Sequence, residues 1–78
     1  MFFVLFIITY PDLKLGNSLK IISPYSFSYN NLAKIEIPNS VIAVQESAFK
    51  ANQLTDITIP NSVSSIGVNA FLNKDTTI

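Results

Sequence analysis

The stretch that decides the fold is Asn31 to Phe71, which reads NLAKIEIPNSVIAVQESAFKANQLTDITIPNSVSSIGVNAF. It contains one pattern twice, because the segment Leu32–Phe49 returns as Leu54–Phe71 and so defines a 22-residue period. Both copies share Leu-x-x-Ile-x-Ile-Pro-Asn-Ser-Val and end in an Ala-Phe pair. A fixed period of about 20–50 residues indicates a solenoid of stacked repeats.

A weaker copy of the pattern precedes these two. Its matching positions are Leu13, Leu15, Gly16, Asn17, Ser18, Leu19, Ile22, Ser26 and Phe27. We therefore divide the chain into repeats 10–31, 32–53 and 54–75, with the start of a fourth at 76–78. Since the chain stops where a fourth strand would begin, we expect either a fragment or a short protein without a polar cap.

Residues 1–9 form a separate apolar segment. The run Phe2–Ile8 is too short to span a bilayer, which takes about 20 residues. In the 22-residue register the segment is interpreted as a cap or as the end of a preceding repeat. Alternatively it is a truncated secretion signal, although it lacks a basic start and a small-residue cleavage site. The residues leave both interpretations open.

Each repeat begins with the alternation of a strand. In Lys34–Pro38 two Ile residues alternate with two charged ones, and the proline ends the strand because it has no N–H to donate. Gln45–Phe49 is expected to form one helical turn that places its last two residues on the core. Gly67, in the Gln45 column, is expected to tolerate a positive φ. The sequence therefore predicts a β-rich α/β solenoid of about three repeats, with a parallel sheet on one face and short helical turns.

Stacking places residues that are one period apart side by side. Phe27, Phe49 and Phe71 are then expected to form an internal row of stacked rings. In the column that contains Lys34 the charges alternate in sign, so like charges do not meet. The outward positions of the sheet are the candidate protein-binding face: Asp12, Lys14, Lys34, Glu36, Asp56 and Thr58.

The composition argues against several functions. In 78 residues five Lys balance five acids, and Arg, His and Cys are absent. A neutral chain without Arg lacks the charge footprint of nucleic-acid binding. Without His or Cys there is no Ser-His-Asp triad, thiol nucleophile or Cys/His zinc site. Two glycines form no phosphate-binding loop. We expect no enzymatic activity, no cofactor and no metal.

The motif Leu-x-x-Ile-x-Ile-Pro-Asn-Ser-Val-x-x-Ile-x-x-x-Ala-Phe resembles the BspA-type leucine-rich repeats. Leu54–Phe71 matches closely, Leu32–Phe49 matches with Val44 in place of Ile, and 10–31 is a degenerate copy. The resemblance implies a right-handed leucine-rich repeat coil. Members are commonly surface or secreted proteins of bacteria and some protists, and several are adhesins. The resemblance therefore implies a location at the cell surface or outside the cell, while a cytoplasmic location stays open.

These observations predict a protein-interaction module of the adhesin type. Its partner would be another protein, and no nucleic acid or membrane span is expected. The competing interpretation is structural: the chain is a spacer or a truncated array that self-associates through its open ends.

Overall fold

The computed structural model describes residues 12–74 of the chain, and the side chains from Lys14 onward. The apolar segment 1–9 and the partial repeat 76–78 lie outside the described residues. The described part contains short strands joined by turns. The first strand of each repeat lies where the apolar–polar alternation predicts it, whereas the second strand of each repeat is not predicted, so the expectation of a sheet on one face only is wrong. The strands are β1 (Asp12–Lys14), β2 (Ile21–Ile22), β3 (Lys34–Glu36), β4 (Ala43–Val44), β5 (Asp56–Thr58) and β6 (Ser65–Ile66).

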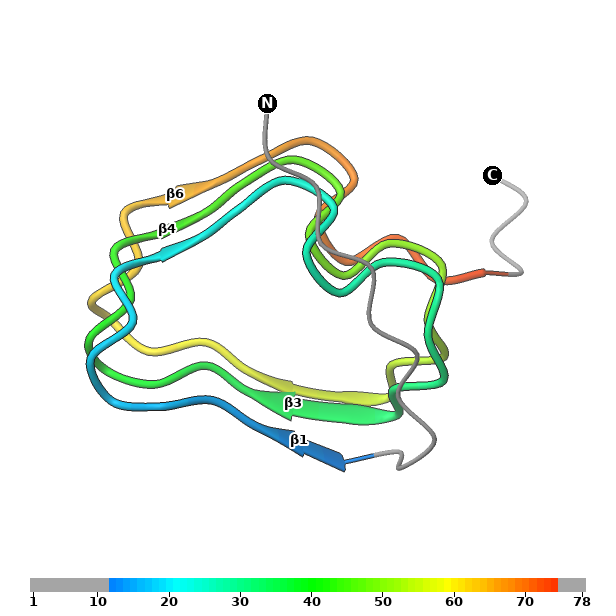
Figure 1. Ribbon diagram of the computed structural model, residues 1–78, viewed down its shortest axis with the longest axis horizontal. Coiled ribbons are helices and arrows are strands. Elements are labelled where there is room, and N and C mark those ends of the chain that lie inside the picture. Colours follow the sequence, from blue (N-terminus) through cyan, green and yellow to red (C-terminus); the bar gives the residue numbers. More distant parts are fainter. Residues whose placement is uncertain (1–11, 75–78) are drawn as a thin grey trace.

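The strands form two parallel sheets, ordered β1-β3-β5 and β2-β4-β6. Leu13 pairs with Ile35, and Ile35 pairs with Ile57, so each residue lies beside its equivalent in the next repeat. The predicted stacking of residues across successive repeats is therefore confirmed for both sheets. Figure 1 shows the chain winding three times around one interior, with one sheet on each side. We name these windings coil 1 (12–31), coil 2 (32–53) and coil 3 (54–74).

The helical turn expected at Gln45–Phe49 is wrong. The described residues contain no helix, and this segment folds as successive turns. Ser47 has a φ of 55°, in the left-handed region, which a right-handed helix cannot accommodate. The same bend recurs one coil earlier at Tyr25 (φ 62°) and one coil later at Asn69 (φ 60°).

The reason for these turns is that their N–H groups bond to the neighbouring coil. Ser47 donates to the carbonyl of Val68 at 3.0 Å, and Phe49 donates to the carbonyl of Ala70 at 2.7 Å. In a helix the same donors would bond four residues back in their own segment. The fold is therefore β-rich and repetitive, with turns where the sequence predicts helix.

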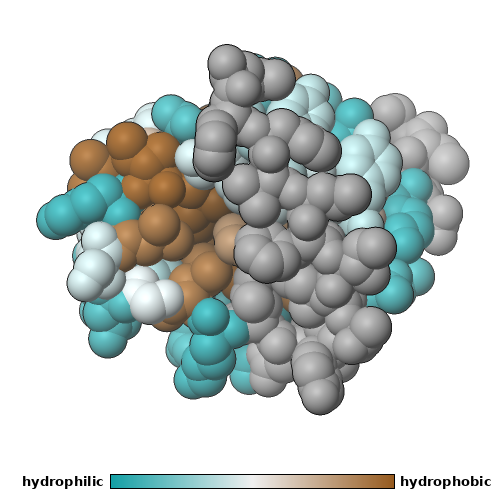
Figure 2. All heavy atoms as spheres, viewed as in Figure 1, coloured by the Kyte–Doolittle hydropathy of each residue, from teal (hydrophilic) through white to brown (hydrophobic). Residues whose placement is uncertain are grey.

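The interior is apolar and centred on a row of rings. Phe27 and Phe49 stack with centroids 5.4 Å apart and planes at 12°, and Phe49 stacks on Phe71 at 5.4 Å and 5°. The predicted aromatic row is confirmed. Figure 2 shows apolar side chains gathered on the end of the coil that faces the viewer, with polar side chains along much of the rim. The buried apolar residues are Ile22, Leu32, Ile35, Ile37, Val41, Val44, Ala48, Phe49, Leu54 and Ala70.

Asn52 is a buried polar anchor between coils. Its Oδ1 accepts the N–H of Leu32 at 3.0 Å, and its Nδ2 donates to the carbonyls of Phe27 at 3.0 Å and Phe49 at 2.8 Å. The Asn52 amide thus connects the end of coil 2 to the start of the same coil and also to coil 1. A buried amide is stable only when its groups are paired in this way.

The equivalent anchor of coil 3 is displaced by one residue. The 22-residue period puts Lys74 in the Asn52 column, but the side chain of Asn73 bonds both backbone groups of Leu54, with distances of 2.7 Å to the nitrogen and 2.8 Å to the oxygen. An amide can pair a buried N–H and C=O together, whereas an ammonium group only donates.

Gly67 is needed for a different reason than the sequence indicates. Its φ is not positive. A Cβ at this position would lie 2.7 Å from the carbonyl carbon of Gln45 and 2.7 Å from the Cα of Glu46, and would also collide with the Glu46 nitrogen. The expected role in backbone conformation is therefore wrong, and Gly67 instead permits close approach of two coils.

Coil 3 exposes positions that coil 2 buries. Ile35 is fully buried, whereas Ile57, one coil later, is 37% exposed. Ile37 and Ile59 differ in the same way, at 3% and 41%. In the described chain coil 3 has a coil on one side only, so its other side carries an apolar surface.

We expect Phe49→Ala to lower the free energy of unfolding by about 3–5 kcal/mol, because the ring is fully buried between two others. Phe71→Ala serves as the matched control and should cost less, since that ring is only partly buried and stacks on one neighbour. Denaturant melts measure both. A loss below about 1 kcal/mol for Phe49→Ala would contradict the core position.

We expect Asn52→Ala to cost about 2–4 kcal/mol, since each buried backbone group left without a partner costs about 1–3 kcal/mol. Asn39→Ala is the control, because Asn39 is exposed and lies in a turn. Its loss should stay within about 0.5 kcal/mol. Equal losses for the two variants would show that the buried amide has no special role.

The two glycines offer a matched pair. Gly67→Ala should destabilise the fold by about 1–3 kcal/mol because the new methyl meets backbone that cannot move aside cheaply. Gly16→Ala should be neutral or slightly stabilising, since nothing lies within 4 Å of that Cβ. Thermal or denaturant unfolding distinguishes them, and a neutral Gly67→Ala would refute the close approach.

Candidate functional site

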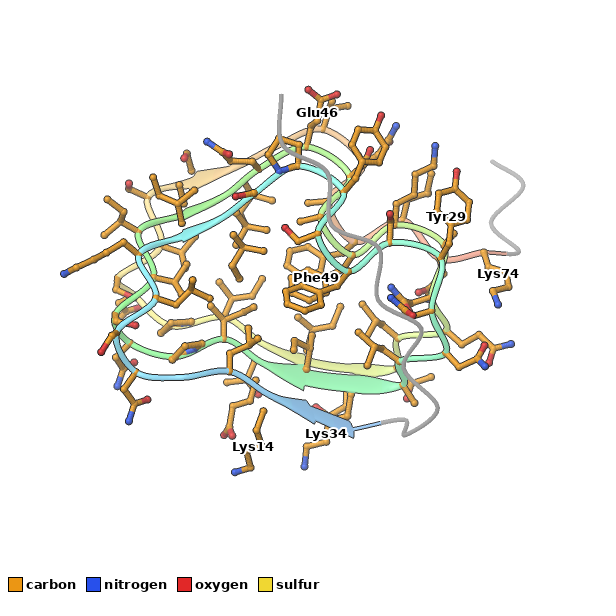
Figure 3. All side chains as sticks on the ribbon, in the orientation of Figure 1. Lys14, Tyr29, Lys34, Glu46, Phe49 and Lys74 are labelled. Carbon is orange, nitrogen blue, oxygen red and sulfur yellow. The ribbon has the colours of Figure 1, made fainter. Side chains whose placement is uncertain are left out.

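The outward side of the sheet β1-β3-β5 brings the predicted binding residues together. The inward residue of β3, Ile35, is fully buried, and its neighbours in the strand face solvent. Figure 3 shows Lys14 and Lys34 projecting away from the interior, on the side opposite Phe49. The predicted residues with described side chains are all exposed: Lys14, Lys34, Glu36, Asp56 and Thr58.

The register arranges these residues in two columns. Lys34 pairs with Asp12 on one side and with Asp56 on the other, and Glu36 lies between Lys14 and Thr58. The position of Asp12 follows from its backbone, while its side chain lies outside the described part. Charges therefore alternate in sign both along the strand and across the sheet, which avoids like charges in adjacent strands. The predicted alternation in the first column is confirmed.

A groove of about 390 Å³ adjoins this face. Lys14, Glu36 and Thr58 form one of the columns that line it, so all three coils contribute. The remaining lining residues follow the same strands: Leu15, Asn17, Ile37, Pro38, Asn39 and Pro60. We use the name binding face for the outward side of β1-β3-β5 together with this groove.

Sequence reasoning did not assign the polar turn residues to the site. Asn17 and Asn39 are separated by one period, as are Pro38 and Pro60, so each pair occupies one column. The period therefore places them beside the binding columns. What the period does not show is that the turn after each strand leaves a hollow there.

The groups on the binding face favour recognition. Amides and hydroxyls both donate and accept hydrogen bonds, Lys donates, and carboxylates accept. Together these groups can donate to and accept from the backbone and polar side chains of a partner. Among residues 12–74 no three His, Cys, Asp or Glu side chains gather as a metal site. Likewise, no helix in this part of the chain is long and apolar enough to cross a membrane.

Two other surface features lie away from the binding face. Tyr29 is 64% exposed and lies in the turns that lead into coil 2, on a different side of the coil from Lys14 and Lys34 (Figure 3). A second hollow of about 330 Å³ follows the other sheet and includes Pro24, Glu46 and Gly67. Its lining includes the backbone contact that Gly67 permits, so it belongs to the packing between coils.

Parallel sheets built on a 22-residue leucine-rich period define a repeat protein of the leucine-rich class. The chain belongs to the BspA type leucine-rich repeat family: residues 7–77 match the family described as BspA type Leucine rich repeat region (6 copies). The resemblance seen in the motif is therefore confirmed. Neither a curated protein nor a solved structure matches the chain. The family is one of non-enzymatic repeats, and membership suggests a protein-interaction role.

Proposed function

We propose that this chain is a non-enzymatic protein-interaction module that binds another protein through the binding face. The observation that carries the proposal is the register, which assembles exposed side chains from three coils into one continuous surface. Repeat proteins commonly bind through extended surfaces of this kind. The family membership supports placing the module in a surface or secreted protein of the adhesin type, either as a short member or as part of a longer array.

The charge pattern of the face indicates what kind of partner fits. Lys34 has acidic neighbours on both sides of its column and Glu36 beside it in the strand. Charges of opposite sign alternate along the strands and across the sheet, so the face has little net charge. Such a face favours specific short-range contacts over long-range steering of a strongly charged ligand. A protein surface with a complementary mixture of Lys and carboxylate groups meets this requirement.

The test is capture by the immobilised, folded chain. Extracellular matrix proteins and cell lysate are passed over the chain, and retained proteins are identified and then titrated individually. A specific partner supports the proposal, whereas no retained protein above the level of an unrelated control protein counts against it.

Lys34→Glu provides the discriminating variant. It replaces the only cation in its column of the described sheet with a third acid, so binding of a true partner should weaken by about tenfold or more. Lys20→Glu is the matched control, because Lys20 is exposed but lies outside the binding face. Circular dichroism checks that both variants fold. Unchanged affinity in a folded Lys34→Glu chain would reject this face as the site.

A second candidate function is structural. In this alternative the chain is a spacer whose open end self-associates. The observation that favours it is the apolar surface of coil 3, where Ile57, Ile59 and Ile66 are 37%, 41% and 49% exposed. Unpaired strand edges beside apolar side chains promote association with other strands.

A further inference from the structure

The end of coil 3 combines apolar side chains with an open backbone edge. β5 is the last strand of its sheet in the described chain. Asp56 donates its N–H to the carbonyl of Ala33 at 3.3 Å, and the carbonyl of Thr58 accepts the N–H of Ile37 at 3.0 Å. Both bonds lead back to coil 2.

The backbone of Ile57 therefore points the other way. Along a strand, the N–H and C=O groups of successive residues face opposite edges. Because Asp56 and Thr58 face β3, the N–H and C=O of Ile57 face the edge where no described strand lies. The Ile57 side chain lies in the same column as the buried Ile35, so the edge presents one donor, one acceptor and an apolar side chain together.

We propose that a second copy of this chain docks on this end, tail to tail, with β5 pairing antiparallel to β5 of the other copy and Ile57 opposite its own equivalent. In an antiparallel hydrogen-bonded pair, the two facing residues exchange both of their N–H to C=O bonds. The orientation of Ile57 meets this requirement in both copies. The contact is the same patch on each copy, so it closes into a dimer. This inference rests on the self-association candidate above and needs no outside partner.

Like-charge repulsion disfavours a head-to-tail stack relative to this arrangement. With Ile57 on the two-fold axis, Asp56 of one copy faces Thr58 of the other, and no like charges meet. A head-to-tail stack in the register used within the chain would instead place Asp12 of the second copy next to Asp56. Adjacent like charges are destabilising. A head-to-tail contact also leaves a new open end, so it would grow into a fibre.

Substitutions at Thr58 distinguish the two arrangements because this exposed residue faces a different charge in each. In the tail-to-tail dimer it faces Asp56, so Thr58→Lys should tighten dimerisation about three- to tenfold at low salt, and Thr58→Glu should weaken it by a similar factor. In a head-to-tail stack it would face Lys14, and the two effects would be reversed.

The experiment is sedimentation equilibrium of the full chain from low micromolar to millimolar concentration, with circular dichroism to confirm that each variant folds. Gln45→Lys and Gln45→Glu are the controls: Gln45 is exposed on coil 2, so the dimerisation constant should not change. A monomer–dimer equilibrium with the Thr58→Lys chain tightest supports the proposal.

The other outcomes overturn it. If Thr58→Glu dimerises most tightly, or if mass grows without limit, self-association stands but the tail-to-tail arrangement is wrong. A chain that stays monomeric at every concentration refutes both the arrangement and the self-association candidate. Neither result affects the binding face, which the capture experiment tests separately.

Discussion

Parallel pairing at a constant offset of one repeat is the constraint on which the rest of this structure depends. The turns donate their N–H groups to the neighbouring coil, as Phe27 does to Ala48 and Phe49 to Ala70. A single coil therefore cannot satisfy its own backbone, and its stability comes from its neighbours. The same offset stacks the three phenylalanine rings and gives the interior a continuous apolar column.

Buried polar groups make that stacking specific. Asn52 pairs backbone groups of two coils with one amide, which an apolar side chain of similar size could not do. Gly67 lets the backbone of coil 3 approach the turn of coil 2 at a distance that no other residue allows. Apolar burial supplies most of the driving force, while these contacts select one register among those that would bury similar area.

The proposals on function rest on two kinds of surface that the described coils present. Their side presents columns of polar residues with alternating charge, and this is the surface that we propose binds another protein. The end at coil 3 presents side chains such as Ile57 that an interior coil would bury, together with a strand edge that pairs with no other strand among residues 12–74. The first surface suits selective recognition, and the second suits a strand of the same pattern. The two surfaces meet at β5, where Thr58 belongs to both.

The sequence by itself determined the period, and with it the strand register, the aromatic row and the placement of Lys34 between two acids. These features can be predicted from the sequence because they depend only on which residues are one period apart. The tertiary structure decided what depends on contacts between coils. The turn at Ser47 replaces a helix because its donors bond to the next coil, Asn73 takes the role that the period gives to Lys74, and the groove forms where the turns leave a hollow. These contacts cannot be predicted from the local sequence, because the residues that make them lie about one repeat apart along the chain.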